Sequence, residues 1–241
     1  MKIAFLIPMT SKGKDWKTIN DSYIVKTTLK TLVKSINYDH EYKFFLGIDH
    51  DDPLFSISSN IEELNNIFIK NKLELDITIF KNIKKGHLTA MWNILYKKAY
   101  DENYDYFYQC GDDIFFRSKN WIDIGIKILL ENNNIGVTGP KTNNLKFLTQ
   151  ALFSRKHYEI FGFLFPETIT NWYCDNWLSD VYKPLYYIEI NNMSVKNTCT
   201  QGRYTIVLNK KIYENEVIKQ KIKLNQYLKN NLIKQDSSEI I

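Results

Sequence analysis

The chain has 241 residues, of which 44% are hydrophobic and 15% aromatic, so it is long and apolar enough to bury a full core. Its net charge of +5 is only mildly basic and its lysines are scattered, which suits a site for a phosphorylated anion and argues against a nucleic-acid partner. No apolar run approaches the length of a bilayer-spanning helix, so we expect no transmembrane segment.

The apolar start of the chain, "MKIAFLIPM", is short and is followed by the charged run "TSKGKDWK" without a cleavage site. We therefore interpret it as a first strand and not as a signal peptide. The three cysteines, Cys110, Cys174 and Cys199, are odd in number and widely spaced, which argues against a disulfide framework or a structural zinc site. These features predict a cytoplasmic protein.

Strand patterns and helix patterns alternate along the chain. Strands are predicted at 2–8, 42–49, 75–80, 104–110 and 134–139, and helices at 18–36, 60–71, 88–102 and 118–132. This alternation favours a single α/β domain whose mostly parallel sheet is covered by helices on both faces. Ligands of such sheets bind beyond the carboxyl ends of the strands, so the residues that follow each strand are the first candidates for a site.

Chemically distinctive residues do follow these strands. The first strand leads into "PMTSKGKDW", the second into "GIDHDDP" and the fourth into "QCGDD", while "KKGHLTAMWN" precedes the helix at 88–102. Adjacent carboxylates such as Asp112 and Asp113 repel each other, so a bound cation is a reason to place them together. Several loops at one sheet edge thus carry carboxylates, lysines and glycines, which indicates a binding site.

This ordered series resembles the nucleotide-sugar glycosyltransferases of the GT-A fold, whose central sheet is Rossmann-like. The run "LTQALFSRKHYEIFGFLFPETITNWYCDNW" is similar to the acceptor side of small single-domain members, including those encoded by large DNA viruses. The resemblance covers most of residues 1–205. Many GT-A enzymes add a late histidine as a metal ligand, and here no histidine follows His157.

The resemblance implies an enzyme of the hexosyl- or deoxyhexosyltransferase type, in the host cytoplasm if the chain is viral. It would move a sugar from a nucleoside-diphosphate donor, with UDP favoured, to a hydroxyl of a glycan or glycoprotein acceptor. Residues 1–208 would form the transferase domain, with a nucleotide-sugar half at 1–116 and an acceptor half at 117–208. Residues 209–241 would form a C-terminal helix and tail.

On the donor side, the resemblance makes Asp113 the ligand of Mn²⁺ or Mg²⁺, since such hard cations take one or two protein carboxylates plus phosphate oxygens and water. Asp112 would share the metal or orient ribose, sugar or a metal-bound water. The alternative is an Asp-rich turn that caps the next helix. Asp49 would accept hydrogen bonds from the nucleotide base, whereas Asp51 and Asp52 are better explained as a turn before Pro53.

Further donor contacts are expected from the first loop and from the segment before residue 88. The candidates are Pro8, Thr10, Ser11, Lys12, Lys85, Gly86, His87 and Asn93. Backbone N–H groups and lysines at a helix start suit a diphosphate. A solvated loop remains an alternative for the lysines, and a half-buried position at the helix start for His87.

On the acceptor side, Asp175 is the expected general base, because an inverting transfer needs a carboxylate that takes the acceptor proton. Trp172 and Trp177 would stack on sugar faces, although Trp at this spacing is also typical of a core. His157 would line the acceptor pocket or support its loop, and Arg155 is a weaker phosphate candidate. The late segment "VKNTCTQGRY" is expected to be a loop over the nucleotide, which offers Asn197, Arg203 and Tyr204 with Gly202 at its turn.

Two other functions remain open from the sequence. A sugar-1-phosphate nucleotidyltransferase also combines such a sheet with a metal, although "PMTSKGKDW" lacks the glycine-rich loop of that class. A nucleotide- or glycan-binding module would keep the fold without turnover. The sequence names neither the sugar nor the acceptor, and a retaining enzyme would share every donor-side motif.

Overall fold

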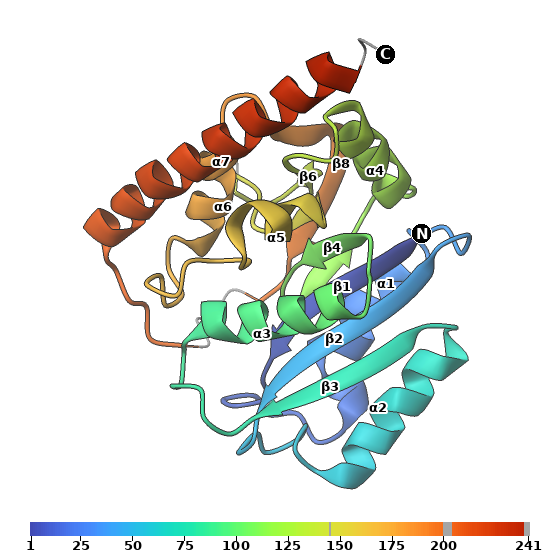
Figure 1. The fold of residues 1–241 in the computed structure, drawn as a ribbon. Coiled ribbons are helices and arrows are strands. Elements are labelled where there is room, and N and C mark those ends of the chain that lie inside the picture. Colours follow the sequence, from blue (N-terminus) through green and yellow to red (C-terminus); the bar gives the residue numbers. More distant parts are fainter. Residues whose placement is uncertain (145, 200–203, 239–241) are drawn as a thin grey trace.

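The structure is a computed structural model that describes residues 1–144, 146–199 and 204–238. In this part of the chain, eight strands form one sheet in the order β3-β2-β1-β4-β7-β6-β8-β5 (Figure 1). The strands are β1 (Lys2–Met9), β2 (Glu41–Asp49), β3 (Glu74–Phe80), β4 (Tyr106–Gln109), β5 (Ile114–Phe116), β6 (Val137–Lys141), β7 (Ala151–Ser154) and β8 (Tyr187–Asn197).

Strand directions bring one set of loops to one edge of the sheet. β1 pairs in parallel with β2 and with β4, and β2 pairs in parallel with β3. β7 is antiparallel to β4 and to β6, and β6 is parallel to β8. The carboxyl ends of β1, β2, β4, β6 and β8 and the amino end of β7 therefore meet at the same edge.

Helical segments cover both faces of the sheet (Figure 1). One core cluster holds alternate β1 residues (Ile3, Phe5, Ile7) against the segments before residue 36 and against α2 and α4, and a second holds Ala4 and Leu6 against α3, α5, α6 and α7. Burial of both faces is what a parallel sheet requires. The segments are η1 (Ile19–Asp21), η2 (Ile24–Leu29), α1 (Lys30–Leu32), α2 (Ser58–Lys70), α3 (Leu88–Asp101), α4 (Trp121–Glu131), α5 (Lys156–Phe161), α6 (Cys174–Tyr182) and α7 (Lys210–Ser238).

The predicted single α/β domain with a mostly parallel sheet is confirmed. Each predicted strand has a counterpart, although the run at 134–139 starts later, because Asn134 and Gly136 have positive φ angles of 60° and 119° after α4. The predicted helix at 18–36 is instead a succession of short turns around the π-helical η2. The Thr28 hydroxyl in η2 forms hydrogen bonds with the backbone of the acidic turn that follows β4. This irregular helical segment therefore helps to hold that turn in place.

The C-terminal part differs from the sequence interpretation in one place. Val195–Asn197, expected in a loop, are the end of β8, and Ile114 pairs with Asn197 there. Gly202 and Arg203 lie outside the described residues. The three cysteines form no disulfide. Within the described ranges, no helix combines the length and the apolar character needed to cross a membrane.

Candidate functional site

A cavity of about 370 Å³ opens at the carboxyl edge of the sheet. It receives residues from the ends of β1, β2, β4 and β8, from the turn after β4, from the loop between β6 and β7, and from the segments at the starts of α3 and α6. Its lining consists of Pro8, Met9, Thr10, Asp49, Gly86, Leu88, Met91, Trp92, Gln109, Gly111, Asp113, Asn144, Phe147, Thr149, Asn171, Trp172, Tyr173, Cys174, Asp175, Asn176, Asn197 and Tyr204. Residues far apart in sequence therefore share one cavity whose lining mixes apolar and polar side chains.

Beside the cavity, a chain of ion pairs begins at Asp49, the last residue of β2. Lys12 Nζ lies 3.2 Å from Asp49 Oδ2 and also pairs with Asp51, and Lys85 Nζ lies 2.7 Å from Asp51 Oδ2. Burial would lower the pKa of Lys12, but the hydrogen bonds to Asp51 and Asp49 outweigh it and raise that pKa. Asp51 thus holds two lysines beside the cavity, although neither lysine lines its wall.

Asp52 organises the loop after β1 and takes no part in the lining. It is fully buried, and its carboxylate accepts hydrogen bonds from Thr10 Oγ1 (2.9 Å), the Ser11 backbone N–H (2.7 Å) and the N–H of Phe55 (2.9 Å). The Ser11 hydroxyl donates to the same carboxylate at 2.5 Å. The turn interpretation of Asp52 is therefore supported. Ser11, predicted as a donor contact, is buried in this turn, whereas Thr10 faces the cavity.

The acidic turn after β4 is fixed from two sides. Thr28 Oγ1 donates to the Asp112 carbonyl at 2.6 Å and accepts from the Ile114 N–H at 2.8 Å. The N–H of Cys199 donates to Asp113 Oδ2 at 2.8 Å, and Thr198 bonds to the Asp113 carbonyl. Both aspartates are at least 98% buried, but only Asp113 belongs to the cavity lining. The adjacent carboxylates therefore differ in their access to a ligand.

Asp175 lies in the first turn of α6 and also lines the cavity. Tyr173 precedes the helix and has a positive φ of 72°, which turns the chain there and places Asp175 at the second helical position. Burial raises the pKa of Asp175 to about 7, although the Cys174 thiol, 3.6 Å away, donates a hydrogen bond to its Oδ1. A carboxylate that titrates near neutral pH suits general base catalysis.

Asn171 joins three segments of the cavity wall and was not predicted. Its side chain is 1% exposed. Its Nδ2 donates to the carbonyls of Gly86 (2.9 Å) and Thr205 (3.0 Å), and its Oδ1 accepts from the N–H groups of Trp172 (2.6 Å) and Val207 (3.0 Å). One amide thus fixes the start of α3, the residues before α6 and the segment before α7. The only sequence signal was an Asn beside Trp172.

Three predicted contact residues lie outside the cavity lining, and two of them, His157 and Trp177, are buried in the protein interior. His157 bonds through Nδ1 to the Tyr182 hydroxyl and through Nε2 to the Leu164 carbonyl, and burial lowers its pKa to about 3. Trp177 is fully buried among aromatic rings. Asn93 bonds to the backbone of Leu164 and Phe165. These positions argue against the predicted acceptor contacts of His157 and Trp177 and the donor contact of Asn93.

The remaining predicted residues also divide into those that line the cavity and those that lie outside its lining. Gly86 and Trp172 line the cavity, and Trp172 is 44% exposed there. His87 contacts the Glu167 carbonyl and lies outside the lining. Arg155 donates to the carbonyls of Tyr100 and Tyr104 and lies outside the cavity lining. Gln109 and Asn176 also line the cavity and were not predicted.

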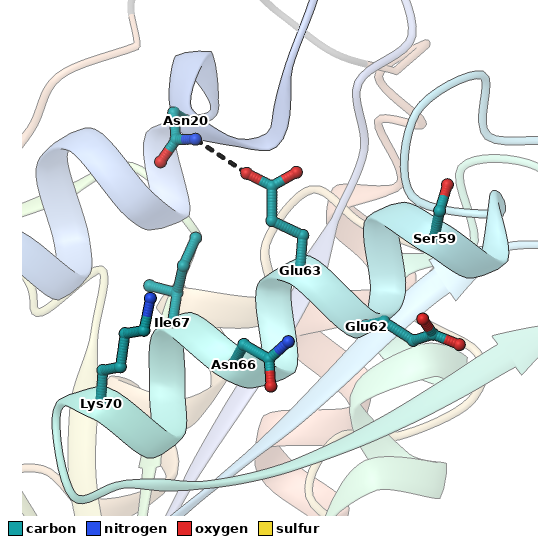
Figure 2. A pocket seen from close by; sticks show the side chains of 7 residues that line it. All are labelled: Asn20, Ser59, Glu62, Glu63, Asn66, Ile67 and Lys70. Atoms are coloured by element: carbon teal, nitrogen blue, oxygen red, sulfur yellow. Dashed lines mark hydrogen bonds between the residues drawn. The ribbon is translucent and has the colours of Figure 1, made fainter.

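A second depression, of about 440 Å³, lies on the outer face of α2 (Figure 2). It is lined by Asn20, Ser59, Glu62, Glu63, Asn66, Ile67 and Lys70, and Asn20 donates a 2.8 Å hydrogen bond to Glu63 across it. None of the strand-end residues reaches this surface. The described ranges also contain no cluster of three or more His, Cys, Asp and Glu side chains that could hold a metal ion by itself.

Comparisons with known proteins find similar folds among solved structures. No protein-family model and no curated protein matches the sequence. A crystal structure of S. aureus TarS aligns with 83% of this chain at 14% identity and a TM-score of 0.54, and this chain spans 37% of that one.

Two further TarS structures, of its residues 1–349, carry ligands. The complex with UDP gives 15% identity and a TM-score of 0.52 over 91% of this chain, and the complex with UDP-GlcNAc gives 13% and 0.54 over 90%. The chain spans 64% of each. At this identity the likeness establishes the fold alone, which is the Rossmann-like α/β fold of the GT-A type.

Proposed function

We propose that the protein is a glycosyltransferase that moves a sugar from a nucleoside-diphosphate donor, UDP-linked, to an acceptor hydroxyl. The observation that carries this proposal is the meeting of Asp49, Asp113 and Asp175 in one cavity at the carboxyl edge of a parallel sheet. The fold shared with TarS, whose structures include complexes with UDP and with UDP-GlcNAc, supports the same donor class.

The nucleotide would lie over the ends of β1 and β2. Asp49 is 23% exposed at its side chain and would accept from the N–H groups of the base, while Pro8 and Thr10, which also line the cavity, would contact the ribose. Lys12 and Lys85 pair with Asp51 close by and would meet the diphosphate after a small movement of their flexible side chains. The chain thereby offers two cations for a charged donor without a glycine-rich loop.

The acidic turn fits a divalent cation, Mn²⁺ or Mg²⁺, as a site that supplies a single protein carboxylate. Such ions take one or two protein carboxylates and complete their shell with phosphate oxygens and water, and Asp113 supplies one carboxylate to the cavity. Asp112, buried behind it, supports the turn through its carbonyl. When bound, the ion would neutralise negative charge on the leaving diphosphate.

Asp175 would act on the acceptor. Its raised pKa of about 7 leaves a substantial fraction deprotonated at neutral pH, and that form accepts the proton of the attacking hydroxyl. Trp172, exposed beside it, offers an aromatic face for a sugar ring of a glycan or glycoprotein acceptor. A carboxylate that removes this proton from the side opposite the leaving group implies inversion at the anomeric carbon.

Hydrolysis of the donor in the absence of acceptor tests the proposal. Incubation with UDP-GlcNAc or UDP-glucose and Mn²⁺, followed by NMR, should show slow release of UDP and free sugar, because transferases let water replace the acceptor. Conversion of radiolabelled pyrophosphate and nucleotide sugar into labelled UTP and sugar-1-phosphate would instead identify a nucleotidyltransferase. Donor binding without any bond cleavage, with acceptor mixtures also present, would identify a binding module and refute transferase activity.

A further inference from the structure

Gln109 is the last residue of β4 and lies on the floor of the cavity. Its side chain is 1% exposed, and its Nε2 has no hydrogen-bond partner among residues 1–144, 146–199 and 204–238. A buried N–H donor without an acceptor is destabilising, so buried amides are normally paired. Gln109 lines the cavity while its Nε2 is covered by protein atoms, so a rotation of the side-chain amide would bring this donor to a ligand oxygen that completes the pairing.

The neighbouring wall is built from uncharged polar side chains. Gln150 Nε2 and Thr149 Oγ1 donate to Asn197 Oδ1 at 2.8 and 3.3 Å, and Asn197 lines the cavity at the end of β8. Because both bonds use the amide oxygen, a ligand that contacts this side chain would meet its nitrogen. Neutral donors of this kind suit hydroxyl or carbonyl oxygens, whereas phosphates are bound better by cations.

The order of the strands suits a position of Gln109 between the proposed diphosphate site and the proposed acceptor site. β4 lies between β1, whose loop faces the nucleotide side, and β7, and Asp113 follows Gln109 after three residues. The transferred sugar has to lie between the diphosphate near Asp113 and the acceptor hydroxyl near Asp175. The floor over β4, where Gln109 lies, is therefore the position for the sugar ring.

From these observations we propose that Gln109, with Asn197 beside it, forms the subsite for the transferred sugar, in which Gln109 Nε2 donates a hydrogen bond to a hydroxyl or acyl oxygen of that sugar. This inference rests on the proposed function and goes further, because it assigns sugar recognition to residues distinct from those for base, metal and proton transfer. Gln109 would discriminate among donors that differ at the contacted oxygen.

Calorimetry with UDP, UDP-GlcNAc and UDP-glucose on the wild-type protein and on Gln109→Met tests this subsite. Methionine has a similar volume without the donor. We expect the affinity for the accepted UDP-sugar to fall about tenfold, the usual effect of one lost hydrogen bond, with UDP affinity unchanged within about twofold. Gln220→Met is the matched control, since Gln220 is 4% exposed on α7 and bonds to Glu216.

Thermal unfolding of the unliganded variant supplies a second measurement. Gln109→Met removes a donor that is unpaired among the described residues, so its Tm should equal or exceed that of the wild type. A lower Tm, an equal loss of UDP and UDP-sugar affinity, or an unchanged UDP-sugar affinity would each overturn the subsite. A wild-type protein that binds UDP but no UDP-sugar would also overturn it, whereas a wild-type protein that binds neither would refute the proposed function as well.

Discussion

The two sides of the cavity are built in different ways. On the proposed donor side, Asp49 ends β2 and the Asp112–Asp113 turn follows β4, so their positions depend on short-range chain geometry. On the proposed acceptor side, Trp172 and Asp175 come from the segment at the start of α6 and Asn197 from the end of β8, and Asn171 bonds Trp172 and Val207 to Gly86 before α3. The donor side is thus a property of single strand ends, whereas the acceptor side depends on contacts between distant segments.

The largest effect that distinguishes the two sides is expected from Asp175→Asn. Asparagine keeps the size and most of the packing but takes up no proton, so turnover should fall by about a hundredfold or more, while UDP-sugar affinity stays near that of the wild type. Steady-state kinetics and calorimetry measure the two quantities separately.

Asp180→Asn provides the control for this change. Asp180 lies on the same helix, where it pairs with Lys183 at 3.1 Å and accepts from the Tyr213 hydroxyl, and it does not line the cavity. Its variant should remain active. Near-normal turnover in Asp175→Asn, or a retained anomeric configuration in the product, would remove Asp175 from its role as base.

On the donor side, Asp49→Ala should weaken UDP binding by about 1 to 3 kcal/mol, the cost of an unmade hydrogen bond to a charged group. The preference for UDP over GDP should disappear with it, because the discriminating acceptor is lost. Calorimetry with both nucleotides measures this convergence. A variant that kept the wild-type preference would place base recognition elsewhere in the cavity.

A smaller effect should follow from pH. Since burial raises the pKa of Asp175 to about 7, the deprotonated base becomes more abundant between pH 6 and pH 8, and kcat should rise by about tenfold over this range. The profile of Asp175→Asn should lack this limb. A wild-type kcat that stayed flat over the same range would show that another group limits proton transfer.

The smallest expected effect concerns stability. The pKa of Asp175 is raised in the folded state, so its stabilising contribution is full below pH 3.8 and is lost as the pH rises through about 7. At pH 8 the wild type therefore holds a poorly solvated charge that Asp175→Asn lacks. The variant should unfold a few degrees higher than the wild type at pH 8 and close to it at pH 4.5, as thermal scans at both values can show. A lower Tm at pH 8 would contradict the assigned burial.

The sequence predicted the residues at strand ends better than the residues that tertiary packing places. The expectation that ligands bind at the carboxyl ends of parallel strands was enough to place Asp49 and Asp113 in one cavity. The reason is that the parallel strands β1, β2 and β4 bring their ends together. It was not enough for His157 and Trp177, whose side chains suit both a sugar site and an aromatic core. Only the packing of α5 and α6 against the sheet showed that both are interior. The hydrogen bonds of Asn171 and the unpaired donor of Gln109 depend on tertiary contacts that have no pattern in sequence.

The measurement that tests the central claim most directly is a titration of UDP into the wild-type protein and into Asp113→Ala, each with and without Mn²⁺. Asp113 is a buried loop residue that lines the cavity and would hold the metal ion, whose positive charge would favour binding of the diphosphate. We predict that Mn²⁺ strengthens UDP binding in the wild type by about tenfold or more and has no effect in the variant, with the circular dichroism of both proteins unchanged. Equal metal-dependent affinity in the two proteins would contradict the donor site described for this cavity.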